Sequence, residues 1–118
     1  MNVLEGFDCI VTIVEKGRCD PVVAAAKAAG AEGGTIIFGR GTGIREFQSF
    51  MGIRIEPEKE IVLTLIKSEI SLRVLEAIVA AGNLEKPGTG IAFILPVKGV
   101  AGICHLLPCL DGSPGGAS

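Results

Sequence analysis

Residues 33–43 read GGTIIFGRGTG and join an apolar strand directly to a cluster of glycines. The segment Thr35–Phe38 favours a β-strand because it contains only β-branched and aromatic residues. The glycines that follow permit backbone dihedrals and close approaches that side chains exclude. Backbone amides exposed in this way suit the binding of an anion. We therefore predict a ligand cradle at the end of this strand, made of Gly39, Arg40, Gly41, Thr42 and Gly43.

The cradle opens into a long segment, residues 41–58, which has no clear period of its own and lies between two strong strand patterns. Long loops in compact domains are usually functional or disordered. We predict that this segment is an irregular regulatory loop. The side chains expected to bind a target are Arg45, Phe47, Phe50, Met51 and Arg54. Apolar side chains on such a loop gain burial on docking, although packing of the same residues onto their own domain is equally compatible with the pattern.

The flanking segments alternate between strand and helix patterns in the order β-α-β-β-α-β. We predict strands at residues 7–14, 35–38, 59–67 and 91–95, and helices at residues 22–29 and from Ser68 to Gly82. Asp20 is expected to cap the first helix, with Pro21 in its first turn, and Ser68 is expected to cap the second. This order is the ferredoxin-like split pattern. It predicts an α+β fold with two helices on one face of a four-stranded antiparallel sheet.

The predicted strands are apolar at consecutive positions, so both faces of the sheet are expected to be hydrophobic. Two helices cover one face. The other would be an exposed patch of a size that soluble monomers rarely show. We predict that further copies of the chain cover it in a closed oligomer. The alternative is that the segment Val97–Leu110 folds back across the sheet.

The length of 118 residues is enough for one domain with a hydrophobic core. We assign residues 1–110 to this domain and expect residues 111–118 to form a flexible tail. A net charge of −2 gives no general attraction to nucleic acid. No apolar run is long enough to cross a bilayer, and Met1–Gly6 does not have the pattern of a signal peptide. The expected location is the cytoplasm.

The four cysteines are unevenly spaced and do not indicate a disulfide framework. Buried or incidental thiols are the simplest interpretation. Near the C-terminus, Cys104, His105 and Cys109 leave two chemical roles open. One is metal coordination, which the absence of paired Cys-x-x-Cys spacing disfavours. The other is a redox pair between the two cysteines.

The order of elements and the placing of the glycines resemble the PII signal-transduction family, the nitrogen regulatory proteins. The similarity covers about residues 7–103. It rests on Gly39–Gly43 at the end of the second strand, on the long loop ending at Pro57, and on the loop running from Ala81-Gly82 to Gly88-Thr89-Gly90 before the fourth strand. The resemblance implies a homotrimer that binds ATP, ADP or AMP in clefts between subunits. It also implies signalling through the long loop to a protein target, such as a transporter or a metabolic enzyme.

The resemblance extends the predicted ligand-binding set to the loop before the fourth strand. The added residues are Gly82, Gly88, Thr89 and Gly90. Lys86, and also Lys98, could act as point charges in place of a phosphate-binding lysine of the family. The resemblance implies that no cofactor is required and that ATP, ADP or AMP would act as an effector in nitrogen or carbon metabolism.

The sequence departs from the family pattern at several ligand-binding positions. Where the family has Gly-Asp-Gly-Lys, this chain has Gly88-Thr89-Gly90-Ile91, so the phosphate-binding lysine is absent. The positions at which the family has two arginines beyond the fourth strand fall near Gly102 and Cys104, so those arginines are absent from this chain. The family's glutamine for magnesium and 2-oxoglutarate is matched by Gly41, and its lysine for the same acid by Glu58. These departures favour a nucleotide with fewer phosphates, or another small anion, as the ligand. The chain has no tyrosine to be uridylylated.

Three alternatives stay open. Catalysis is disfavoured because no general acid-base pair or catalytic triad is visible. The acylphosphatase arrangement would need a phosphate loop at residues 15–19, which contain one arginine. A divalent-cation-binding trimer of the cation-tolerance type shares the predicted fold. A ligand-free interaction module would use the long loop alone.

Overall fold

The computed structural model describes residues 1–41, 48–50, 53–55 and 57–102, with the backbone alone for residues 48–50 and 53–55. The strands are β1 (Phe7–Glu15), β2 (Thr35–Arg40), β3 (Gln48–Phe50), β4 (Ile53–Ile55), β5 (Glu58–Lys67) and β6 (Gly90–Val97). The helices are α1 (Cys19–Ala28) and α2 (Ser71–Gly82), and a short 3-10 helix, η1 (Ser68–Ile70), precedes α2.

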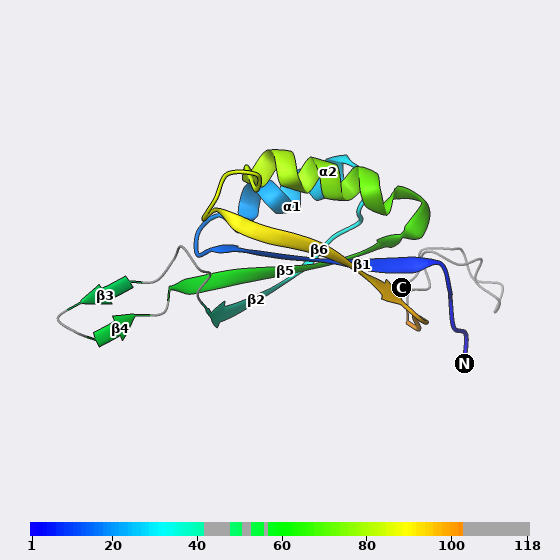
Figure 1. Ribbon diagram of the computed structural model, residues 1–118. Helices are drawn as coiled ribbons and strands as arrows, with labels where there is room; N and C mark the ends of the chain where they lie inside the picture. Colours follow the sequence, from blue (N-terminus) through cyan, green and yellow to red (C-terminus); the bar gives the residue numbers. More distant parts are fainter. Residues whose placement is uncertain (42–47, 51–52, 56, 103–118) are drawn as a thin grey trace.

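The main sheet has the strand order β2-β5-β1-β6, and every neighbouring pair is antiparallel. Both helices lie on one face of this sheet (Figure 1). The α+β ferredoxin-like arrangement predicted from the sequence is therefore confirmed. The strands are slightly longer than predicted, and β2 includes Gly39 and Arg40. These two residues therefore belong to the sheet, where they pair with Lys59 and Glu58.

The segment between β2 and β5 is not irregular throughout, and this part of the sequence prediction is wrong. Within it, β3 and β4 form a two-stranded antiparallel ladder in which Gln48 is opposite Ile55 and Phe50 is opposite Ile53. In Figure 1 this ladder lies beyond the end of the main sheet. Three-residue strands are too short for a two-residue alternation to stand out from a loop sequence.

The predicted helix caps are also wrong. Helix α1 begins at Cys19, so Asp20 lies in its first turn instead of capping it, and Arg18 makes no side-chain cap. Pro21 lies in the first turn, as predicted. Ser68 opens η1 instead of capping α2, and the hydroxyl of Ser71 donates a hydrogen bond of 3.0 Å to the Ser68 carbonyl. The predicted end of α2 at Gly82 is confirmed, with Asn83 in the left-handed conformation as the C-cap.

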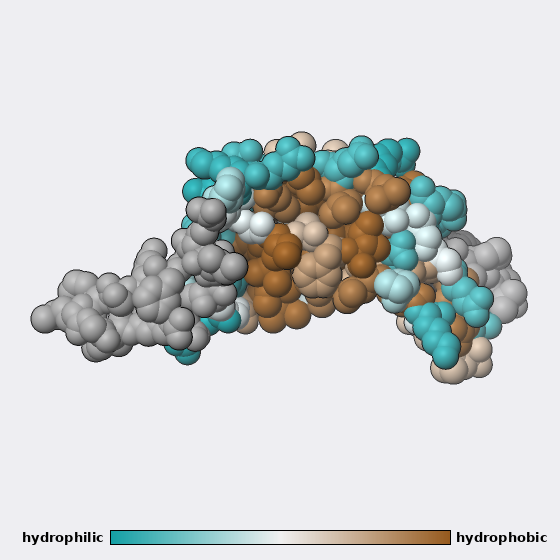
Figure 2. All heavy atoms as spheres, in the orientation of Figure 1, coloured by the Kyte–Doolittle hydropathy of each residue, from teal (hydrophilic) through white to brown (hydrophobic). Residues whose placement is uncertain are grey.

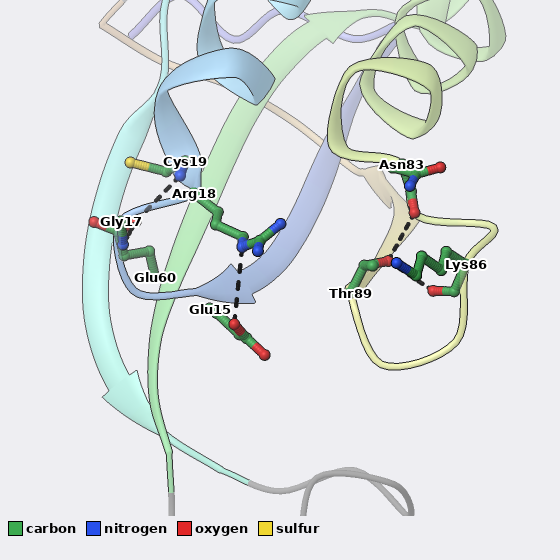
Figure 3. A network of polar contacts seen from close by, with 8 residues as sticks. All are labelled: Glu15, Gly17, Arg18, Cys19, Glu60, Asn83, Lys86 and Thr89. Carbon is green, nitrogen blue, oxygen red and sulfur yellow. Dashed lines mark hydrogen bonds and ion pairs between the residues drawn. The ribbon is translucent and has the colours of Figure 1, made fainter.

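The first turn of α1 is capped by a carboxylate from β5. Oε1 of Glu60 accepts hydrogen bonds from the backbone amides of Gly17, at 2.7 Å, and Cys19, at 3.1 Å (Figure 3). Burial of Glu60 opposes its ionisation, but the hydrogen bonds from the Cys19 thiol and from the amides of the turn outweigh burial and lower the pKa of Glu60. The carboxylate therefore satisfies amides that a helix leaves without partners.

Burial raises the pKa of the Cys19 thiol to about 11, and the hydrogen bond to Glu60 and its negative charge add to this effect. The thiol is therefore protonated at neutral pH, and a protonated buried thiol is chemically inert. For this residue the sequence interpretation of a buried structural cysteine is confirmed.

The core lies between the sheet and the two helices. From the sheet, alternate residues of β1 and β5 point into it, including Ile10, Val14 and Val62. The helices contribute apolar side chains that are equally buried, among them Val22 of α1 and Ile78 of α2. Because only one face of each central strand is used, the intervening residues of the same strands point to the opposite face.

That opposite face, which we call the open face, carries apolar side chains in register across the sheet. One row consists of Ile37, Ile61, Ile13 and Ile91, one isoleucine from each strand of the main sheet. The next rows are Leu63-Val11-Phe93 and Leu65-Cys9-Leu95. On β6 the exposed fractions are 56% for Ile91, 37% for Phe93 and 47% for Leu95. The second hydrophobic face predicted from the sequence is present, and Figure 2 shows hydrophobic surface extending over β6.

The chain beyond β6 does not turn back over the open face within the described residues. Val100 and Leu4 exchange two backbone hydrogen bonds, of 2.8 and 2.9 Å, and continue the β1–β6 ladder past the end of both strands. The alternative in which residues 97–110 cover the sheet is therefore wrong as far as Gly102. Residues 103–110 and the predicted tail at 111–118 lie outside the described residues.

Replacing Ile78 with alanine is expected to lower the free energy of unfolding by about 2–5 kcal/mol, because the fully buried side chain would leave a cavity under α2. Leu72→Ala on the same helix is the control, since Leu72 is 68% exposed and should cost less than about 0.5 kcal/mol. Urea denaturation followed by circular dichroism measures both. Equal losses of unfolding free energy in the two variants would show that Ile78 is not buried in the core.

Glu60→Gln is expected to lower the melting temperature at neutral pH, because it removes the charge that caps α1. The pKa of Glu60 is lowered by folding, so its contribution is present above its ordinary pKa and disappears as the pH falls through that value and below, from about pH 4. The difference between the two proteins should therefore shrink in acid. Glu58→Gln serves as the control and should have a smaller effect, because its ion pair is exposed. A constant difference across pH would contradict the capping role.

Candidate functional site

The two predicted groups of ligand-binding residues lie at the same end of the sheet but at opposite edges. Arg40 of β2 is opposite Glu58 at the start of β5, and Gly90 of β6 is opposite Val14 near the end of β1. Two strands, β5 and β1, separate β2 from β6. At about 4.8 Å per strand, the two edges are roughly 14 Å apart. One chain therefore does not bring the two groups together into a single site.

The loop between α2 and β6 is organised by its own hydrogen bonds. The hydroxyl of Thr89 lies 2.8 Å from the carbonyl oxygens of both Asn83 and Lys86 (Figure 3). The Lys86 amide donates to the Asn83 carbonyl at 3.1 Å, and the Thr89 amide donates to the Lys86 carbonyl at 3.3 Å. The single hydroxyl proton of Thr89 is thus donated to a carbonyl oxygen of the loop itself. In this structure Thr89 therefore stabilises the conformation of the loop.

The glycines of the predicted set have different structural roles. Gly90 has φ +152°, and a side chain there would place its Cβ 2.5 Å from the carbonyl oxygen of Ile13. A Cβ at Gly82 would lie 3.0 Å from the Leu84 side chain and 3.3 Å from Val22. At Gly39 the nearest atom would be Cδ1 of Ile61, at an ordinary contact distance of 3.4 Å. Gly90 is therefore required by the backbone, whereas packing permits a methyl group at Gly39.

A hollow of about 660 Å³ lies at the end of β2. It is lined by Lys16, Phe38, Gly39, Arg40, Glu58 and Lys59. Sequence reasoning identified Gly39 and Arg40 but missed Lys16 and Phe38 as lining residues, because Lys16 follows a different strand and Phe38 reads as a strand-core residue. The amide of Gly41, predicted to face a ligand, donates to the Pro57 carbonyl at 3.3 Å and closes the base of segment 41–58.

Lys16 and Glu58 form an ion pair at the rim of this hollow. Nζ of Lys16 lies 2.8 Å from Oε2 of Glu58, and the Lys16 amide donates to the Glu58 carbonyl at 3.2 Å. The hydrogen bond to Glu58, together with its charge, raises the pKa of Lys16, and the same bond lowers the pKa of Glu58. Both groups are therefore charged at neutral pH. Since both are more than half exposed, the pair stabilises the fold only slightly.

The turn between β1 and α1 does not offer a phosphate loop of the acylphosphatase kind. Its amides at Gly17 and Cys19 already donate to the Glu60 carboxylate. An incoming phosphate would have to displace a buried carboxylate and would be repelled by it. This geometry argues against the acylphosphatase alternative.

A second hollow, of about 520 Å³, lies at the opposite end of the sheet, where β5 continues past the beginning of β2. Its lining includes Phe7, Thr35, Leu65 and Arg73. None of the predicted ligand-binding residues belongs to it.

Metal binding and membrane insertion find no support in the described part of the chain. No group of three His, Cys, Asp or Glu side chains is arranged there to hold a metal ion. No helix there has the length and apolar character needed to span a bilayer. Cys104, His105 and Cys109 lie outside the described residues.

Comparison with models of protein families identifies the family of this chain. The family model "Nitrogen regulatory protein P-II" matches residues 7–104, which is most of the chain. The chain belongs to the P-II family. A search among curated proteins finds no significant match. P-II proteins are regulators rather than enzymes, and the resemblance inferred from the sequence is confirmed.

Some of the predicted P-II site residues lie outside the described part of the chain. These are Thr42 and Gly43 of the ligand-binding set, and Arg45, Phe47 and Met51 of the target-binding set. Phe50 lies in β3 and Arg54 in β4, with the backbone alone described. The roles of the individual ligand-binding and target-binding residues stay predictions.

Gly90→Ala is expected to lower the melting temperature strongly, because the new Cβ would collide with the Ile13 carbonyl. Gly39→Ala is the matched control at the same end of the sheet and should change the melting temperature little, because its Cβ would make only an ordinary contact. Thermal unfolding of both variants without ligand checks this difference. A Gly90→Ala variant as stable as the unmodified chain would contradict the described packing.

Proposed function

We propose that this P-II family protein is a homotrimer that binds an adenine nucleotide between subunits and signals to a protein target through segment 41–58. The observation that carries the proposal is the position of the predicted ligand-binding residues. They lie at the same end of an open-faced sheet but at opposite edges, so a complete site needs a second copy of the chain.

The open face supplies the driving force for such an assembly. Its three rows contribute large apolar side chains from all the strands of the main sheet. Burying the surface that Leu95 and Phe93 still expose is favourable by about 25 cal/mol per Å² of apolar area, which is less than for a fully exposed side chain. When open faces meet around a common axis, the β2 edge of one copy can approach the β6 edge of the next. Such a head-to-tail contact closes into a ring.

The ligand proposed for the cleft is an adenine nucleotide with few phosphates. On one side it would meet Arg40 and Gly39 at the end of β2. On the other it would meet the ordered loop carrying Lys86 and Gly88 from a neighbouring copy. Ile91 supports the preference for few phosphates, because it stands where the family resemblance places a phosphate-binding lysine.

Segment 41–58 is proposed as the element that reports ligand binding to the target. Its two ends meet at the hollow, where the Gly41 amide bonds to the Pro57 carbonyl and Lys16 bonds to Glu58. A ligand that contacts Arg40 therefore acts at the base of the segment. Regulation of a transporter or enzyme of nitrogen or carbon metabolism is the corresponding biological role.

Light scattering is expected to give a mass of about three chains of 12.2 kDa, and nucleotide should raise the melting temperature. A ligand present at 100 times its dissociation constant adds about 2.7 kcal/mol to stability. ATP, ADP, AMP and 2-oxoglutarate are to be compared. A trimer stabilised by none of them would refute the nucleotide and preserve the assembly. A monomer would refute the shared cleft.

Phe93→Lys is expected to reduce the mass toward one chain, because it places a charge on the open face. Nucleotide stabilisation should be lost together with assembly. Leu72→Lys is the control, since Leu72 is exposed on the helix side, and this variant should keep both properties. Nucleotide binding by a monomeric Phe93→Lys protein would contradict a cleft shared between subunits.

A further inference from the structure

Strand β5 extends past the beginning of its outer neighbour, β2. Pairing between these two strands starts at Thr35, which lies opposite Leu63, whereas β5 runs on to Lys67. On its other side, β5 stays paired with β1 as far as Lys67. Residues 64–67, which we call the β5 edge, are therefore bonded to a strand of the described chain on one side only.

The hydrogen bonds of β5 show which backbone groups point outward from the β5 edge. At the two ends of the strand, the amide of Ser68 and the carbonyl of Glu58 bond to the β1 side, at 2.8 and 3.2 Å. Successive residues of a strand bond alternately to its two sides, so Leu65 and Lys67 direct their N–H and C=O groups to the β2 side. Within the described ranges, neither residue has a backbone bond there. Such unpaired groups are a template for a further strand.

The hollow of about 520 Å³ lies along the β5 edge and is lined from both faces of the sheet. Leu65 and Lys67 line it from the open face, whereas Ile70 and Arg73 line it from the helix side. The chain leading into β2 passes the hollow at Gly33, which adds no side chain to it. This shape suits an extended peptide, because a strand bonds through its backbone and points its side chains alternately to the two faces.

The charges at the β5 edge favour an acidic peptide. Lys67 and Arg73 are exposed, and neither forms an ion pair with another described residue. Glu32 also lines the hollow, but it already has an interaction of its own. Neighbouring residues of an added strand point to opposite faces, so two adjacent carboxylates would meet Lys67 on one face and Arg73 on the other.

A second copy of the chain is a poorer match for this charge pattern. Its main sheet has two edge strands, β2 and β6, which read TIIFGR and GIAFILPV. Neither strand contains a carboxylate, and Pro96 in β6 has no N–H to donate. The complementary partner is therefore a different polypeptide.

We propose that the β5 edge is a docking site for an extended acidic segment of a partner protein, which joins the main sheet as an additional strand. In the antiparallel orientation, the peptide residues opposite Leu65 and Lys67 each exchange two main-chain hydrogen bonds with them. The inference goes beyond the proposed function, because the β5 edge lies at the opposite end of the sheet from segment 41–58 and from the proposed nucleotide cleft.

Titration of the complete ¹⁵N-labelled chain with the peptide Val-Glu-Glu-Val, followed by NMR, tests the site. The peptide reads the same in both directions, so it suits either strand orientation. The amide signals of Leu65 and Lys67 should shift and exchange more slowly with solvent, whereas those of Thr64 and Ile66, bonded to β1, should change less. Val-Gln-Gln-Val is the control and should bind roughly 2- to 20-fold more weakly, since it lacks two exposed ion pairs. Equal affinities, or shifts located elsewhere, overturn the inference.

Two variants at Lys67 separate its charge from its backbone N–H. Lys67→Gln removes the charge and should weaken Val-Glu-Glu-Val binding by about 2- to 5-fold. Lys67→Pro also removes the N–H and should weaken it by a further factor of roughly 2 to 10. Lys67 has φ −68°, which proline adopts without strain, so both variants should fold with similar melting temperatures.

Arg73→Gln tests the second cation independently of the backbone. It should weaken the binding of Val-Glu-Glu-Val and leave that of Val-Gln-Gln-Val unchanged. If Lys67→Pro binds the acidic peptide as well as Lys67→Gln does, the edge N–H is not used and the inference is overturned. If light scattering shows a smaller mass for Lys67→Pro, the β5 edge is a contact between copies, which also overturns it. Nucleotide stabilisation is measured separately, so the proposed function and this inference fail on different results.

Discussion

The structure depends on one mismatch: the central strands are hydrophobic on two faces, and the helices cover only one. Ile10, Val14 and Val62 point toward α1 and α2, while Val11, Ile13 and Ile61 point the other way. The alternation that builds the core therefore builds the open face at the same time. A substitution that made the open face polar would leave the helix side intact, so folding of the subunit and its proposed assembly would rest on different residues of the same strands.

Two contacts of β5 with the turn between β1 and α1 link the fold to the candidate site. Glu60 stands near the start of β5 and caps α1 through Gly17 and Cys19, and its neighbour Glu58 bonds to Lys16 in the same turn. Hydrogen bonds and an ion pair thus join the turn between β1 and α1 to β5, the strand that follows segment 41–58. The same two contacts place Lys16 at the rim of the hollow beside Arg40. The residues that hold the helix also fix the geometry around the proposed ligand.

Local patterns in the sequence were enough to predict the main sheet, both helices and the second hydrophobic face, because each depends on runs of apolar residues. They failed where the interaction is distant in sequence. The cap of α1 comes from Glu60, more than forty residues away, so Asp20 was a reasonable but wrong choice. The ladder of β3 and β4 was missed because each strand has only three residues. Phe38 was assigned to a strand, correctly, but only the strand order shows that its ring lies at an edge.

The isoleucine row connects the departures from the family pattern with the proposed ligand. Ile91 stands where the resemblance places a phosphate-binding lysine, and it extends the row of Ile13, Ile61 and Ile37 to the β6 edge of the sheet. A lysine there would put a charge beside this apolar row, whereas isoleucine adds apolar surface to the open face. In the proposed trimer, loss of a phosphate contact and gain of interface would therefore be two effects of one side chain. On the β6 side of the proposed cleft, Ile91 therefore favours a ligand that carries few phosphates.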